Sequence, residues 1–333
     1  MLAGLGAVAL VTAHGPRAEP AASRTPDLVA GGFVADGRQP LGTLLANFDE
    51  FATRHGWVAE TVFAYDDAPG ESIRAWRTVA EGEALWIVAG IHGEEPAGPN
   101  AIAAHVEAVA AFARTARVPV VVLPLCNPRA YARNWRYPNT AERDWRAGGG
   151  YSVGDAEHLL PHLEQPDRPR APRAPGPETQ ALTQYVLRLA ERYPPRLVLD
   201  LHEDELSAEG GYLYSQGVQA DDNPVAAEIV RQLQASGLAL RRDGQTRFGE
   251  PIVDGVISRD DRGGPIRDGS IDELFAATDV FVGGRRARGP AAGTVIVVET
   301  PAFAGARLEQ RVAAHGAVVR GLERLWSLAP PRR

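Results

Sequence analysis

Four short apolar runs constrain the fold of this chain more than any other feature of its sequence. They are residues 85–91 (LWIVAGI), 118–125 (VPVVVLPL), 197–201 (LVLDL) and 294–298 (TVIVV). Each run is nearly continuous rather than alternating with polar residues, which is typical of strands buried on both faces. Segments of helical character lie between them. The sequence therefore predicts an α/β fold, with a mostly parallel or mixed central sheet and helices on both faces.

The segments between the runs are either helical or irregular. Helices are expected over residues 96–114, 178–192, 224–236 and 307–325. Residues 127–176 show no clear period and carry many Arg, Pro and Gly residues, and residues 243–270 are also rich in loop-forming residues. Long irregular stretches in a compact domain are usually functional or mobile. Because there is no internal repeat, we expect a single domain over residues 31–330.

Residues 1–30 are interpreted as a candidate leader and linker. Residues 1–13 (MLAGLGAVALVTA) resemble the apolar part of a signal peptide but lack its positively charged start, and residues 14–30 are rich in Pro, Ala and Arg. Both an exported or periplasmic location and a cytoplasmic one therefore stay open. No later stretch reaches the roughly 18 apolar residues of a membrane span, so none is expected.

Composition excludes several kinds of site and partner. The 333 residues include one cysteine, Cys126, so neither an intramolecular disulfide nor a cysteine-rich zinc site can form. Any metal must be held by His, Asp or Glu. The net charge of −7 argues against a general nucleic-acid binder. No Gly-rich loop ends in Gly-Lys-Ser/Thr, which argues against a nucleotide hydrolase.

The ends of the predicted strands carry His and Glu residues suited to chemistry. His92 and Glu95 follow the first run, His202 follows the third, and Glu299 follows the fourth. Ligands of such sheets bind beyond the carboxyl ends of the strands, so these side chains are expected to converge. Two His and one Glu are the ligand set of a catalytic zinc with an open fourth position. A free Glu299 nearby could accept a proton from water.

Each of these residues also has an ordinary structural explanation. A histidine at a strand end is commonly a core or surface residue, and a carboxylate there commonly caps the next element. Asp200 illustrates the choice, because it alternates with His202 on one strand face. It either orients that ligand or caps a loop. The joint placement of all four residues is what favours the metal site.

In this order, the residues resemble the zinc carboxypeptidase superfamily, which includes the succinylglutamate desuccinylase and aspartoacylase branch. The matching pieces are HGEEP at 92–96, NP at 127–128, DLH at 200–202 and ETP at 299–301, and the similarity covers roughly residues 80–325. The resemblance implies one Zn²⁺ per chain, held by His92, Glu95 and His202. It also implies that Glu299 is the general base.

The resemblance further implies two arginine roles. An Arg after the Asn-Pro pair would polarise the scissile carbonyl, and Arg136 fits this role, with Arg133 as its rival. Where the family usually has Asp-Leu-Asn-Arg to bind the substrate carboxylate, this chain has RDWR at 143–146, and Arg146 is the candidate that keeps the charge. No Tyr occurs between Tyr214 and Glu299, unlike the mobile Tyr of digestive carboxypeptidases.

The sequence thus predicts a zinc-dependent hydrolase that cleaves an amide bond next to a free carboxylate, as a carboxypeptidase does. Glu299 and Arg136 would be catalytic, and Arg136 and Arg146 would bind a peptide or N-acyl amino-acid substrate. One alternative is an N-acyl amino-acid deacylase of the desuccinylase or aspartoacylase type. An alternative of another class is a catalytically inactive binding module on the same fold.

Overall fold

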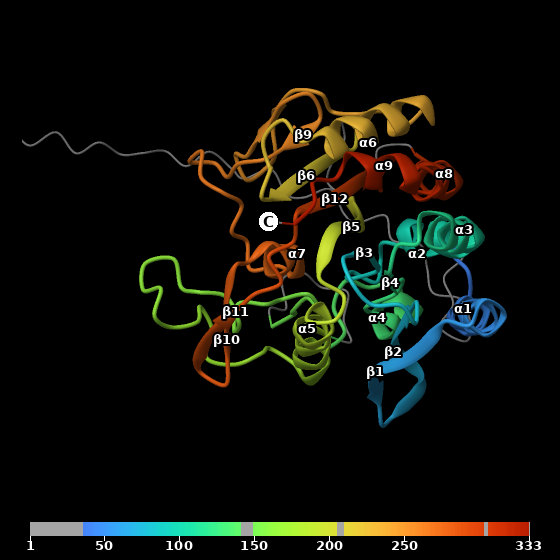
Figure 1. The fold of residues 1–333 in the computed structure, drawn as a ribbon, viewed down its shortest axis with the longest axis horizontal. Coiled ribbons are helices and arrows are strands. Elements are labelled where there is room, and N and C mark those ends of the chain that lie inside the picture. Colours follow the sequence, from blue (N-terminus) through green and yellow to red (C-terminus); the bar gives the residue numbers. More distant parts are fainter. Residues whose placement is uncertain (1–35, 141–148, 205–209, 303–305, 333) are drawn as a thin grey trace, which may run out of the picture.

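The computed structural model describes residues 36–140, 149–204, 210–302 and 306–332, and a central sheet dominates it (Figure 1). Within these residues, eight strands form the sheet: β1 (Val58–Tyr65), β2 (Ala68–Arg77), β3 (Ala84–Ala89), β4 (Val120–Leu123), β5 (Pro195–Asp204), β6 (Tyr212–Gly217), β9 (Val256–Ile257) and β12 (Thr294–Pro301). Their order across the sheet is β1-β2-β4-β3-β5-β12-β6-β9. Two small antiparallel pairs lie outside it: β7 (Gly244–Gln245) with β8 (Pro251–Ile252), and β10 (Asp279–Val282) with β11 (Arg285–Arg288).

The four predicted apolar runs form the centre of this sheet. β4, β3, β5 and β12 are neighbours and run parallel. Toward the edges, β2 pairs with β4, β1 with β2, and β6 with β12 in antiparallel fashion. The expectation of a mostly parallel or mixed sheet with helices is therefore confirmed, and the sheet is mixed.

Helices cover both faces of the sheet. One face packs α1 (Leu41–His55), α2 (Ala97–Ala104), α3 (Val106–Ala116), α6 (Pro224–Ala235), α8 (Leu308–Arg320) and α9 (Leu322–Leu328). The other packs α5 (Pro177–Ala190) and α7 (Ile271–Ala276). Successive residues of β5 show the division, because Leu197 and Leu199 belong to the first core and Val198 to the second. Both faces are thus apolar, which explains the continuous hydrophobic runs.

Two of the predicted helices are each divided. Residues 96–114 form α2 and α3 with a break at His105, whose φ of −123° is not helical. Residues 307–325 form α8 and α9, which meet at Gly321. Apolar periodicity continues across both breaks, since all four helices pack on the same face of the sheet, so the pattern alone could not reveal them.

The segment 127–176, expected to be irregular, contains the short helix α4 (Pro128–Arg133). The side chain of Asn127 accepts a hydrogen bond from the backbone N–H of Ala130, and Pro128 occupies the first helical turn. These are standard helix-start signals, but six residues are too few to show a period. No helix among the described residues is long and apolar enough to cross a membrane.

The candidate leader and the proposed start of the domain at residue 31 lie outside the described residues, so the boundaries 1–30 and 31–330 stay predictions.

Candidate metal centre

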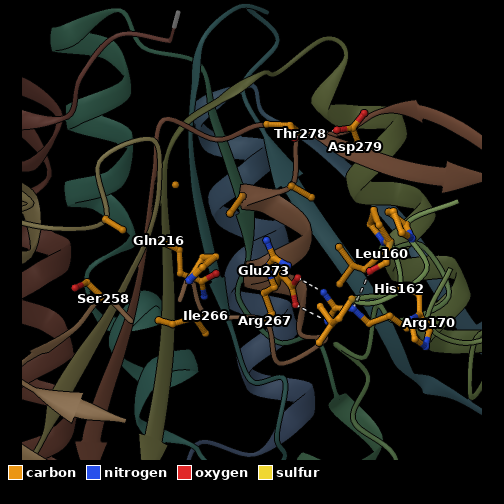
Figure 2. A pocket seen from close by; sticks show the side chains of 18 of the residues that line it. Leu160, His162, Arg170, Gln216, Ser258, Ile266, Arg267, Glu273, Thr278 and Asp279 are labelled. Atoms are coloured by element: carbon orange, nitrogen blue, oxygen red, sulfur yellow. Dashed lines mark hydrogen bonds and ion pairs between the residues drawn. The ribbon is translucent and has the colours of Figure 1, made fainter. Parts of the chain in front are cut away.

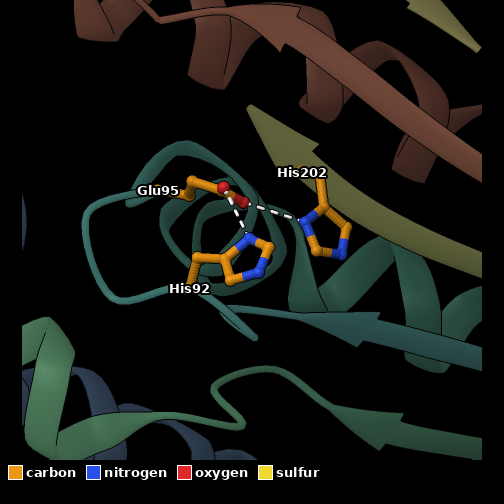
Figure 3. A group of neighbouring side chains, drawn as sticks. All are labelled: His92, Glu95 and His202. Carbon is orange, nitrogen blue, oxygen red and sulfur yellow. Dashed lines mark hydrogen bonds and ion pairs between the residues drawn. The ribbon is translucent and has the colours of Figure 1, made fainter. Parts of the chain in front are cut away.

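His92, Glu95 and His202 converge at the carboxyl edge of the sheet (Figure 3). The Nδ1 atom of His92 lies 2.7 Å from Oε1 of Glu95, and Nδ1 of His202 lies 2.9 Å from Oε2 of the same carboxylate. One potential ligand atom from each residue lies within 4.8 Å of the others. Glu95 and His202 are buried and His92 is half-buried. Two imidazole nitrogens and a carboxylate so arranged could hold a metal ion.

The turn between β3 and α2 presents the first two of these residues. A Cβ atom on Gly93 would lie 2.1 Å from the carbonyl carbon of Ala130 and 2.3 Å from the backbone nitrogen of Tyr131. Only glycine therefore fits between His92 and α4. The buried guanidinium of Arg38 links the turn to α4. Its Nη1 donates hydrogen bonds to the carbonyl oxygen of Gly93, at 2.9 Å, and to that of Tyr131, at 2.7 Å.

The second ring nitrogen of each histidine faces an oxygen. Nε2 of His202 lies 3.2 Å from Oδ1 of Asp200, and Nε2 of His92 lies 3.4 Å from Oγ of Ser152. A proton on Nε2 leaves the Nδ1 lone pair free for a metal. Of the two interpretations of Asp200, the structure favours the one in which it orients His202.

The two histidines differ in their pKa values. Burial, together with the nearby Arg136, lowers the pKa of His92 to about 4, so this ring is neutral at pH 7. Burial opposes protonation of His202 as well, but the carboxylates of Asp200 and Glu95 outweigh it and raise its pKa well above the usual range. A metal would therefore displace a proton from His202 on binding.

Glu299 lies next to this group on the neighbouring strand. It pairs in register with His202 on β5 and with Tyr212 on β6. Burial, with Glu95 and Asp204 adding to it, raises the pKa of the Glu299 carboxyl well above its usual range, although His202 and Arg136 oppose the shift. The half-buried Glu299 carboxylate, when ionised, could accept a proton.

Of the candidate arginines, the structure places Arg136 at the site. Its Nη1 lies 3.1 Å from Oε1 of Glu94 and 3.2 Å from Oε1 of Glu95. Its rival Arg133 ends α4 and does not line the cavity beside the histidines. Arg146 lies outside the described residues, so its proposed contact with a substrate carboxylate stays a prediction.

A cavity of about 330 Å³ adjoins both histidines. The other residues with ionisable or hydroxyl side chains in its wall are Arg136, Tyr137, Tyr151, Ser152, Asp155, Asp268, Ser270 and Asp272. Burial is the main cause that raises the pKa of Asp155 to about 6 and that of Asp272 to about 8. The cavity is large enough for part of a small substrate, and it lies where one would reach the proposed metal.

Sequence reasoning missed most of this wall, because it comes from the two segments expected to be irregular. Two local signals were available. Ser270 caps α7 by accepting a hydrogen bond from the backbone N–H of Glu273, in a Ser-x-x-Glu pattern. Ser152 lies in GYSVG at 150–154, a Gly-x-Ser-x-Gly pattern. That serine is not on a strand-to-helix elbow, since the structure gives residues 150–155 no strand or helix.

A second cavity, of about 400 Å³, lies beyond α7 (Figure 2). Its wall includes the paired side chains of Arg170 and Glu273. Gln216 also lines it and donates a hydrogen bond from Nε2 to Oδ2 of Asp272 in the first cavity, 2.9 Å away. The two cavities are therefore neighbours, but among the described residues only the first contains a His/Glu group suited to a metal.

Solved structures show which proteins share this fold. A provisionally assigned metallopeptidase from Shewanella baltica is 21% identical, with a TM-score of 0.64 over 86% of this chain and 91% of that one. A similar protein from Shewanella amazonensis is 19% identical, with a TM-score of 0.63 over 86% and 93%. Carboxypeptidase A from Helicoverpa armigera is 13% identical, with a TM-score of 0.56 over 88% and 74%. No protein-family model and no curated protein matches the chain.

The chain therefore has the fold of metallopeptidases and metallo-carboxypeptidases. At these identities the likeness concerns the fold, and activity has to be argued from the site.

Proposed function

We propose that this protein is a zinc-dependent hydrolase that cleaves an amide bond next to a free carboxylate. The convergence of His92, Glu95 and His202 carries the proposal, because one ring nitrogen from each histidine and one carboxylate oxygen lie within 4.8 Å of one another and match the three protein ligands of a catalytic zinc. Such a set leaves a fourth position open to water or substrate. The fold of the metallopeptidase neighbours supports a metal at this place.

Glu299 and Arg136 supply the remaining chemistry. A zinc ion bound here would polarise the substrate carbonyl and make water more acidic. Glu299 accepts the proton of the attacking water and delivers it to the leaving amine nitrogen. Arg136 donates hydrogen bonds to the oxygen that becomes negatively charged when the carbonyl carbon turns tetrahedral. Water thus adds to the carbonyl carbon, the carbon–nitrogen bond breaks, and the products are an acid and an amine.

An N-acyl amino-acid deacylase is the second candidate. It is favoured by the absence of any Tyr between Tyr214 and Glu299, which removes the mobile Tyr of digestive carboxypeptidases. Both candidates use the same metal and base and differ in the acyl group that they release. The third candidate, an inactive binding module, has no need of a carboxylate at position 299. Measured turnover of any substrate would exclude it.

Product analysis tests the proposal directly. The zinc-loaded protein is incubated with peptides and N-acyl amino acids, each with a free or an amidated carboxylate, and the products are identified by mass spectrometry. Glu299→Gln should keep its zinc and lose on the order of 10²- to 10⁴-fold in turnover, whereas His202→Ala should lose zinc. Ser152→Ala should retain the chemistry. If turnover persisted in His202→Ala and after zinc removal but was lost in Ser152→Ala, the reaction would depend on the serine and not on a metal.

A further inference from the structure

We infer that Glu94 is a positioning residue that balances the charge of Arg136 when Glu95 binds the metal. This inference rests on the proposed function and adds to it a residue that does not touch the metal or the substrate. Glu94 stands between the two candidate ligands His92 and Glu95 in sequence.

The side chains of Glu94 and Arg136 are in close contact. The Glu94 side chain is 5% exposed, and its Oε1 lies 3.1 Å from Nη1 of Arg136. The same nitrogen lies 3.2 Å from Oε1 of Glu95, so two carboxylates share one guanidinium edge.

Metal binding would change this balance. Oε1 of Glu95 lies 2.7 Å from Nδ1 of His92, and the negative charge of the Glu95 carboxylate would be neutralised largely by the metal. Arg136, whose side chain is 24% exposed, would then hold its positive charge beside a divalent cation. Like charges repel at this range, so the guanidinium would weaken metal binding unless a carboxylate offsets its charge. Glu94 supplies a negative charge beside the guanidinium without using a coordination position.

Both partners sit on backbone that is held in place. Gly93, which precedes Glu94, packs against α4 with no room for a side chain, and its carbonyl accepts from Arg38. The carbonyl of Arg136 accepts a hydrogen bond from Nδ2 of Asn127 at 3.0 Å. Because both backbones are fixed, the ion pair can keep the guanidinium in one place, and displacements near 1 Å at such sites cost roughly 10²-fold in rate.

Zinc affinity tests the inference without relying on turnover. Glu94→Gln keeps the shape and removes the charge, so we expect zinc to bind about 10- to 100-fold more weakly, the range found for residues that support metal ligands. Adding Arg136→Gln to this variant removes the unbalanced charge and should restore most of the affinity. A purely structural role of Glu94 would give no such rescue. Affinities are measured by competition with a chelator.

Kinetics at saturating zinc provide the second measurement. Glu94→Gln should lower kcat by about 10- to 100-fold with little change in KM, since Arg136 acts in the transition state. Glu94→Asp should fall between it and the wild type. Glu60→Gln is the matched control, because Glu60 pairs with Arg77 at 2.9 Å on the edge strand β1, and it should leave kcat unchanged.

Three results would overturn the inference. They are unchanged zinc affinity and kcat in Glu94→Gln, failure of Arg136→Gln to restore zinc binding, and complete loss of the metal, which would make Glu94 a ligand. A wild-type protein that binds zinc but hydrolyses none of the substrates would refute the proposed function alone, and the affinity measurements would still decide the role of Glu94.

Discussion

At the scale of single residues, several carboxyl groups are buried at or beside the site, among them those of Glu95, Asp200 and Asp272. Asp272 is 8% exposed, and its carboxylate accepts a hydrogen bond from the neutral side chain of Gln216. Burial first, and then the nearby Asp268 and Asp200, raise its pKa from 3.8 to about 8. Such a residue is tolerated only if it is protonated or if the site uses its charge.

This shift makes stability depend on pH in a stated direction. Between about pH 4 and pH 8 the folded protein binds more protons at Asp272 than the unfolded chain does, so the free energy of unfolding falls as pH rises. Asp272→Asn removes the titrating group, so this decrease in the free energy of unfolding should disappear. At pH 8 the metal-free variant should be more stable than the wild type by more than about 1 kcal/mol, and the difference should shrink toward pH 4.

Urea unfolding at several pH values measures the effect. Asp243→Asn, on an exposed aspartate, serves as the control and should follow the wild-type curve. Wild-type and Asp272→Asn curves that run parallel from pH 4 to pH 8 would show that Asp272 is ionised throughout.

At the scale of elements, the turn between β3 and α2 determines whether the metal ligands meet. Gly93→Ala would place a methyl group against the backbone of α4, 2.1 Å from the carbonyl carbon of Ala130. Backbone must move to make room, and we expect a loss of about 1–3 kcal/mol in unfolding free energy. Because the movement separates His92 from Glu95, zinc affinity should fall as well.

Gly42 in α1 offers a matched control. A Cβ atom there would meet nothing within 4 Å, so Gly42→Ala should be neutral or stabilising by up to about 1 kcal/mol. Denaturant melts and zinc titrations of both variants give the comparison. Equal behaviour of the two alanine variants would mean that the turn adapts and that glycine is not required.

Sequence patterns predict some of these elements and miss others. β3, β4, β5 and β12 were predictable because strands buried on both faces leave continuous apolar runs. β1 and β2 were not, since their burial alternates irregularly and their register shifts between Thr61 and Tyr65. α7 was missed because six residues carry a cap but no period.

At the scale of the whole molecule, the proposed metal joins two distant segments. Glu95 and His202 are 107 positions apart in the chain and belong to the first turn after β3 and to β5. An ion that binds only the folded arrangement stabilises it by mass action, by about 2.7 kcal/mol when its concentration is 100 times the dissociation constant. The melting temperature should therefore rise with zinc concentration.

Thermal melts with increasing zinc check this expectation, with His202→Ala as the control that should show no rise. Magnesium should have little effect, because it prefers oxygen ligands over imidazole nitrogen. A melting temperature independent of zinc in the wild type would remove the main support for the proposed function.

Five arginines between positions 129 and 146 illustrate what a sequence leaves open. Arg129 pairs with Glu71 at 2.9 Å and lies 3.7 Å above the ring of Tyr65, so it belongs to the packing of the sheet edge. Arg136 instead reaches the buried carboxylates beside the histidines. The spacing of the arginines along the chain cannot distinguish these two roles, because the residues that Arg129 and Arg136 contact are about 40 to 65 positions away in the sequence.

Local patterns in the sequence were enough to locate the central strands and the His and Glu residues at their ends, because burial on both faces and the position after a strand are properties of neighbouring residues. The convergence of His92, Glu95 and His202 followed from parallel strands ending at one edge. The antiparallel outer strands, the cavity with Asp155 and Asp272, and the pairing of Glu94 with Arg136 became evident only from the folded molecule. These features depend on contacts between segments far apart in the chain, whose energies no local pattern contains.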